Sequence, residues 1–118
     1  MAMGASLTPG TLSAAAGKKP LLTFGICSDI HLDLMPDGQR RLQAFLNAMG
    51  ALQPDFIIQL GDFCSPHAKN KIYADAFNGF SAPAFHVIGN HDTDYGFTHQ
   101  QVVAFLRMPA PYYSFDAK

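Results

Sequence analysis

The apolar and polar positions of residues 21 to 62 change period twice. "LLTFGIC" (21–27) and "DFIIQLGD" (55–62) are short apolar runs rich in β-branched and aromatic residues, a pattern typical of buried strands. Between them, "GQRRLQAFLNAMGAL" (38–52) carries its large apolar residues at helical spacing, which predicts an amphipathic helix. The sequence therefore predicts a βαβ unit.

The second half of the chain continues this alternation. "NKIYADAFNGF" (70–80) contains a second predicted helix, and "AFHVIGNHD" (84–92) is another apolar run that ends in a polar turn. Thr98 is positioned to cap a third helix over 99–107, and a last short strand is expected within "YYSFD" (112–116). Parallel strands need crossover connections of this length, so we expect a βαβαβ arrangement of the α/β class.

A polar cluster follows each of the three predicted strands. The clusters contain Asp29 with His31, then Asp62, then Asn90 with His91. The carboxyl ends of parallel strands lie at one edge of a sheet, where open α/β sheets bind ligands. Residues two apart on a strand point to the same side, which predicts that Asp29 and His31 converge. Carboxylate, imidazole and amide ligands suit Mn, Fe or Zn, although each Asp or Asn alone would more often be a turn or cap residue.

The motifs that carry these residues resemble those of a known family. "DIH" (29–31), "GDF" (61–63) and "GNHD" (89–92) occur in the order and at the spacing of the calcineurin-like metallophosphoesterases. The resemblance runs from residue 21 to the end of the chain. It implies phosphoester hydrolysis, by a phosphatase or phosphodiesterase, and an α/β/β/α sandwich of which residues 21–118 are the N-terminal portion.

The resemblance also implies a role for each motif residue. Asp29 and His31 would bind one divalent cation, Asp62 would bridge two, and Asn90 would bind the second through its side-chain oxygen. His91 would not be a ligand but would approach the scissile phosphoester as the catalytic residue. The expected cofactors are two divalent metal ions, Mn, Fe or Zn, and the expected partner is a phosphoester substrate.

Several features depart from the family pattern. The family has further histidines after the third motif, including a GHxH-like pair, whereas no histidine follows His99 in this chain. We therefore expect an incomplete metal site, and the alternative is a non-catalytic remnant or binding module that keeps the first half of the fold. The sheet surface left uncovered is expected to be apolar and to permit self-association. Of the remaining histidines, His86 is expected in the core, and His67 and His99 in solvent.

Other residues near the motifs have more than one interpretation. Asp33, Asp92 and Asp94 are close enough in sequence to accept hydrogen bonds from the imidazoles of the site. Asp92, beside His91, is the strongest of these candidates, with a turn residue as the equal alternative. Cys64 is expected to act as a small buried hydrophobe, and Cys27 and Cys64 as free thiols.

Composition limits the remaining classes. The chain has 118 residues, of which 48% are hydrophobic and 14% charged, with a net charge of -1, which is typical of one globular domain at most. No basic patch points to nucleic acid, and no apolar run is long enough to span a membrane. Residues 1–20, rich in Ala, Gly, Ser and Thr, are expected to be a flexible leader, with a clipped export signal as the alternative. Location is therefore either cytoplasmic or exported.

Overall fold

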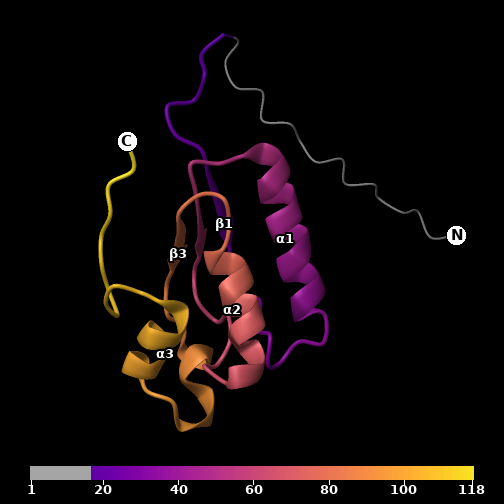
Figure 1. Cartoon of the computed structure of the whole chain (residues 1–118), viewed down its shortest axis with the longest axis vertical. Coiled ribbons are helices and arrows are strands. Elements are labelled where there is room, and N and C mark those ends of the chain that lie inside the picture. The colour runs from indigo at the N-terminus through magenta and orange to yellow at the C-terminus, as the bar shows by residue number, and fades with distance from the viewer. Residues whose placement is uncertain (1–16) are drawn as a thin grey trace, which may run out of the picture.

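Three parallel strands form the centre of the structure, a computed structural model that describes residues 17–118. The strands are β1 (Phe24–Cys27), β2 (Phe56–Gln59) and β3 (Ala84–His86), and their order in the sheet is β1-β2-β3. Phe24 pairs with Phe56, and Ile58 pairs with Phe85. The predicted α/β class and parallel strand order are confirmed (Figure 1).

Two helices cover one face of this sheet. They are α1 (Gly38–Leu52) and α2 (Lys71–Asn78), which follows the short 3-10 helix η1 (Ala68–Asn70). Figure 1 shows both helices on the same side of the strands, and the rings of Phe45 on α1 and Phe77 on α2 stack with centroids 6.3 Å apart. Ile57 on β2 and Phe63 are fully buried beneath these helices. The apolar stripe of each helix therefore packs on the sheet, as its helical spacing predicts.

The third helical region lies at the carboxyl end of the strands. It consists of the 3-10 segment η2 (Asn90–Gly96) and the helix α3 (His99–Leu106). The Thr98 side chain accepts a hydrogen bond from the backbone of Gln101, and the Gln101 side chain accepts one from the backbone of Thr98. This capping box confirms the predicted start of α3. Val102 and Leu106 are fully buried against the core.

The opposite face of the sheet is mostly open. Phe24 and Ile26 on β1 are each 50% exposed, because no helix in residues 17–118 covers them. Over β2 and β3, Phe115 stacks on Phe85 with ring centroids 3.6 Å apart and packs edge-on against Phe56 at 5.3 Å. The expected apolar surface is therefore present, and the C-terminal segment covers part of it.

The strand expected within residues 112–116 is not formed. This segment runs beside β3 without strand pairing. The Tyr113 hydroxyl accepts a hydrogen bond from the His86 backbone nitrogen (2.9 Å) and donates one to the His86 carbonyl oxygen (2.7 Å). The Tyr113 side chain thus occupies the His86 N–H and carbonyl oxygen, with which a neighbouring strand would have paired. The alternating aromatic residues therefore pack on the sheet without forming a strand.

Two expectations about the chain as a whole concern its first residues and its cysteines. Of the predicted leader, residues 1–16 lie outside the described part of the chain. No helix within residues 17–118 is long and apolar enough to cross a membrane.

Cys27 and Cys64 are free thiols as predicted, and Cys64 is buried. Burial raises the pKa of Cys27 to about 12 and raises that of Cys64 further, so both thiols stay protonated at neutral pH.

Candidate metal centre

The loops that leave β1 and β2 run side by side beyond the ends of the strands. The backbone nitrogen of Asp29 donates to the Gly61 carbonyl oxygen (3.1 Å), and that of His31 donates to the Asp62 carbonyl oxygen (2.9 Å). These bonds continue the parallel ladder into the first two motifs. The predicted meeting of the motifs at one edge of the sheet therefore has a backbone cause.

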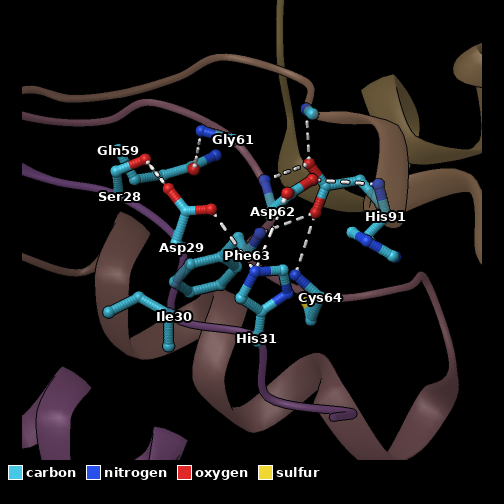
Figure 2. A network of polar contacts seen from close by, with 12 residues as sticks. Ser28, Asp29, Ile30, His31, Gln59, Gly61, Asp62, Phe63, Cys64 and His91 are labelled. Carbon is cyan, nitrogen blue, oxygen red and sulfur yellow. Dashed lines mark hydrogen bonds and ion pairs between the residues drawn. The ribbon is translucent and has the colours of Figure 1, made fainter. Parts of the chain in front are cut away.

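The side chains of Asp29, His31 and Asp62 converge at this edge. His31 Nε2 lies 3.3 Å from Asp29 Oδ1 and 3.7 Å from Asp62 Oδ2, and one potential ligand atom from each residue lies within 4.8 Å of the other two. Figure 2 shows these side chains directed toward one another. His31 and Asp62 are largely buried, with 19% and 15% of their side-chain surface exposed, whereas Asp29 is 62% exposed. The group is therefore open to solvent on the Asp29 side.

The sequence predicts that strand alternation brings Asp29 and His31 together, but the structure shows a different cause. β1 ends at Cys27, and Asp29 and His31 have φ angles of 57° and 50°. Asp62 has a φ of 54°. Left-handed conformations are uncommon for residues other than glycine and often occur at functional sites. Three left-handed turns, rather than extended backbone, therefore aim the three side chains at one point.

Two glycines permit the second and third motifs to touch. A Cβ atom on Gly89 would lie 2.2 Å from Asp62 Oδ1 and 2.4 Å from the Asp62 backbone nitrogen. Gly61 has a φ of 107°, and a Cβ atom there would lie 2.8 Å from the Gly89 nitrogen. Any side chain at either position would push the two loops apart, which explains why the motifs place glycine there.

The third motif brings His91 against the first two. Its backbone nitrogen donates to Asp62 Oδ1 (2.9 Å), and its ring centroid lies 5.3 Å from that of His31. His91 Nδ1 donates to Asp94 Oδ2 (2.7 Å), and this hydrogen bond raises the pKa of His91. Asp94 is therefore one of the predicted imidazole acceptors. Asn90 is exposed and begins η2 at the same edge of the sheet.

Asp92 was predicted either to orient an imidazole or to be a turn residue. The imidazole interpretation is wrong, whereas its side chain caps the Gly89 backbone N–H at the start of η2. Its carboxylate is fully buried and accepts hydrogen bonds from four backbone N–H groups, those of Asp62, Phe63, Cys64 and Gly89. Burial raises the pKa of Asp92, and the four N–H groups oppose that shift. The side chain contacts backbone and not imidazole because its chain position places it beneath the loop of the second motif.

Asp33 likewise binds no imidazole. Its carboxylate accepts hydrogen bonds from the backbone and hydroxyl of Ser65 (2.7 and 2.8 Å) and from Asn70 Nδ2 (2.9 Å).

His67, expected in solvent, is half-buried, and its Nδ1 lies 2.6 Å from the Ser65 hydroxyl. The His67 ring packs against Phe97. That prediction is wrong, whereas His99 is exposed as predicted. Isolated loop histidines give no sequence signal of such packing.

Sequence reasoning missed Arg41, which supports the loop of the first motif. From α1 its guanidinium donates to the carbonyl oxygens of Asp29 (3.1 Å) and Ile30 (2.7 Å), and its Nε pairs with Asp37 (3.1 Å). These bonds hold the two carbonyl groups that lie between the Cα atoms of the left-handed residues Asp29 and His31. The helical pattern indicates only that Arg41 lies on a polar part of the helix surface, so the sequence contains no signal for this contact.

His86 is a core residue, as predicted. Its Nδ1 lies 3.1 Å from Gln59 Nε2, and its Nε2 lies 2.7 Å from Asn78 Oδ1. Because the Gln59 amide donates and the Asn78 oxygen accepts, the ring is neutral with its proton on Nε2. Burial lowers the pKa of His86 to about 4. His86 is therefore part of the support of the sheet and not of the metal centre.

The donor set at the sheet edge suits divalent cations. It offers two carboxylates and one imidazole, and one potential ligand atom of each residue lies within 4.8 Å of the other two. The hydrogen bond from Ser28 lowers the pKa of Asp29, which keeps that carboxylate ionised. A parallel α/β sheet with such a group at its carboxyl edge is typical of α/β proteins that bind a metal ion or another ligand at this edge.

Comparison with known proteins identifies the family. The model of the calcineurin-like phosphoesterase family matches residues 22–117, and the chain belongs to this family. It is 27% identical to a manganese-dependent ADP-ribose/CDP-alcohol diphosphatase of Arabidopsis thaliana, over 86% of this chain and 40% of the relative. It is 28% identical to a protein of the same description from Oryza sativa subsp. japonica, over 94% of this chain and 42% of the relative. The chain thus spans about two fifths of the length of the curated relatives it matches.

The fold also has a counterpart among solved structures. The crystal structure of a dimetal phosphatase from Danio rerio superposes with a TM-score of 0.57 at 18% identity, over 73% of this chain and 34% of the other. At this identity the similarity concerns the fold. The predicted family and fold class are confirmed.

Proposed function

We propose that this chain contributes the first half of the active site of a metal-dependent phosphoester hydrolase. The observation that carries the proposal is the convergence of Asp29, His31 and Asp62 within 4.8 Å at the carboxyl edge of the sheet. Three separate loops supply or support these side chains, and all three of these residues are in a left-handed conformation. Residues that serve only as turns would not need three left-handed conformations that direct three potential ligands at one point.

The residues present fit divalent cations of the Mn, Fe or Zn type. Asp29 and His31 would hold one ion, and Asp62, with one oxygen beside His31 and the other at the third motif, would bridge to a second. Asn90, at the start of η2 on the same edge, would add its side-chain oxygen to the second ion. Bound ions of this kind polarise phosphoryl oxygens and acidify water.

His91 would act on the substrate and not on the ions. Asp94 accepts the proton of His91 Nδ1, which fixes the ring and leaves Nε2 free. His91 is 42% exposed, so a substrate can reach it. The raised pKa of His91 favours the protonated ring, which can stabilise charge on the phosphoryl group and give a proton to the leaving oxygen.

The curated relatives suggest the substrate class. Both are described as diphosphatases that act on ADP-ribose or CDP-alcohols, whose scissile bond is a phosphoanhydride. We therefore propose that the complete site of this chain hydrolyses the phosphoanhydride bond of nucleoside diphosphate derivatives. The identities of 27% and 28% support this class and no individual substrate.

A non-catalytic binding module is the second candidate. In residues 17–118, Asp29, His31 and Asp62 are the one group of three or more His, Cys, Asp or Glu side chains that could hold a metal ion. Three such ligands and an amide are few for two ions, so we propose that residues 21–118 are the N-terminal portion of a domain whose other ligands come from elsewhere. Without those ligands, one ion would bind and turnover would be absent.

The two candidates differ in turnover. The chain would be incubated with Mn²⁺ and ADP-ribose, a CDP-alcohol or an aryl phosphate, while calorimetry measures the number of ions bound. Asp62→Asn should lower metal binding and hydrolysis together, whereas His91→Ala should lower hydrolysis by about 100-fold or more and leave metal binding intact. Because the half-site alone is expected to bind metal without turnover, the candidates are separated by supplying the remaining part of the domain. Metal binding that is still without hydrolysis would then favour the binding module. Absence of metal binding by the unaltered chain would refute both.

A further inference from the structure

Asp92 is a buried carboxylate with no cation beside it. Its exposed fraction is 0%, and its hydrogen-bond partners are four backbone N–H groups at 2.7 to 3.0 Å. None of the ion pairs among residues 17–118 includes it. A buried carboxylate is costly unless its oxygens are fully hydrogen-bonded. Asp92 is therefore stable in this position only while the surrounding loops present their N–H groups to it.

The four donors come from two different motifs. One oxygen of Asp92 accepts from Phe63 (2.7 Å) and Cys64 (3.0 Å), which follow Asp62 in the second motif. The other accepts from Asp62 (3.0 Å) and from Gly89 (2.7 Å), which begins the third motif. A single oxygen thus joins the backbone of the candidate bridging ligand to the loop that carries Asn90 and His91.

A hydrogen bond in the opposite direction completes the connection. The backbone nitrogen of His91, next to Asp92, donates to Asp62 Oδ1 (2.9 Å). The second and third motifs therefore each donate a backbone N–H to a carboxylate of the other. With Oδ1 of Asp62 engaged, its Oδ2 lies on the His31 side, 3.7 Å from Nε2. The direction of the Asp62 carboxylate follows from this exchange of hydrogen bonds.

We propose that Asp92 is a positioning residue that sets the bridging ligand Asp62 for metal binding, by holding the second and third motifs together. This inference rests on the proposed function, because it assigns Asp62 to a metal. Asp62 has a φ of 54°, a conformation unfavourable for an aspartate without outside support. The hydrogen bond from its own N–H to Asp92 supplies that support at the residue that needs it. Asp92 itself is fully buried, and its carboxylate is bonded to backbone N–H groups.

Asp33 provides a matched control. It is also a buried carboxylate, with 7% of its side chain exposed, and it accepts a hydrogen bond from a backbone N–H group. Unlike Asp92, it also binds the side chains of Ser65 and Asn70 and pairs with Lys69 (3.4 Å). Its donors belong to Ser65, Lys69 and Asn70, so it bonds to no residue that we assign to the metal centre. Asp33→Asn and Asp92→Asn therefore make the same chemical change at two buried carboxylates, and only Asp92→Asn disturbs the support of Asp62.

The test measures Mn²⁺ affinity by calorimetry and unfolding by urea on the same samples. Asp92→Asn turns an NH₂ group toward two N–H donors, and we expect Mn²⁺ affinity to fall by about 10- to 100-fold, as for other residues that orient metal ligands. Asp33→Asn should destabilise the fold without weakening Mn²⁺ binding. Unchanged affinity in Asp92→Asn, or equal losses in both variants, would overturn the proposal.

Asp92→Ser serves if the asparagine variant does not fold. The hydroxyl is smaller and leaves space for water, so the N–H groups are not opposed by another donor, and the same loss of Mn²⁺ affinity is expected. Hydrogen exchange in the unaltered chain requires no variant and no metal. The amides of Asp62 and Gly89 should exchange together and slowly, because one oxygen binds both. Much faster exchange of Gly89 would show that Asp92 does not join the loops.

These measurements separate the two proposals. If the unaltered chain binds no Mn²⁺, the proposed function fails in this chain. Slow, shared exchange of Asp62 and Gly89 that is lost in Asp92→Ser would still support the positioning of Asp62 by Asp92. If Mn²⁺ binds and neither Asp92 variant weakens it, the proposed function stands and the positioning role fails.

Discussion

The buried histidine of β3 should make the fold sensitive to mild acid. His86 is 3% exposed, and its ring is bonded to two neutral amides, those of Gln59 and Asn78. Phe63 and Phe77 pack against the same ring. Within residues 17–118, no carboxylate forms an ion pair with this ring, so protonation of His86 opposes folding.

The sign and size of the effect follow from the two pKa values. Burial lowers the pKa of His86 from 6.5 to about 4 in the folded chain, so at intermediate pH the unfolded chain binds the proton and the folded chain does not. Stability from this group is complete above pH 6.5 and is lost progressively as the pH falls toward 4. Linkage gives a loss of about 2 kcal/mol between pH 7 and pH 5.

Urea unfolding followed by circular dichroism at pH 7, 6 and 5 measures this loss. His86→Gln removes the titrating group, so its free energy of unfolding should fall less than that of the unaltered chain over the same range, by about 2 kcal/mol. His99→Gln, at an exposed histidine, should retain the full pH dependence. Other titrating groups contribute equally to all three chains and cancel. Parallel pH profiles for the unaltered chain and His86→Gln would refute the reasoning.

Two further predictions concern the open sheet face and the cap of α3. Ile26→Lys, at a half-exposed position on β1, should reduce self-association in sedimentation velocity experiments, whereas Leu52→Lys, on the exposed end of α1, should not; equal effects would show that the sheet face is not involved. Thr98→Ala should lower the free energy of unfolding by about 1 kcal/mol through loss of the bond to Gln101, and Thr98→Ser should restore most of it; no loss in the alanine variant would show that the cap contributes nothing.

The sequence predicted the three strands of the sheet, the three helices and the edge at which the candidate ligands meet, because the periodicity of short segments indicates each strand and helix. Thr98 shows this well, since a hydroxyl three residues before a glutamine is a local signal. Asp29 and His31 were predicted to converge, but through strand alternation, whereas left-handed turns aim them. The periodic pattern ends where the turns begin, so it contains no information on these dihedral angles.

The residues that support the site could not be predicted for a related reason. Arg41 and Asp92 act through backbone groups far away in the sequence, and any residue type can offer a backbone N–H or carbonyl oxygen. Their partners therefore leave no mark in the sequence. The segment at Tyr113 was mistaken for a strand because its aromatic residues alternate, although a hydroxyl, rather than backbone, bonds to β3.

This hydroxyl makes the two edges of the sheet unequal. Tyr113 occupies the outward N–H and carbonyl oxygen of His86, so an incoming chain cannot extend the sheet by regular pairing along β3. In residues 17–118, β1 pairs with β2 alone, and no side chain blocks its outer backbone groups in a comparable way. An unpaired edge of this kind is a template for strand addition. Growth of the sheet by another chain would therefore be one-sided, and it would proceed from β1 outward.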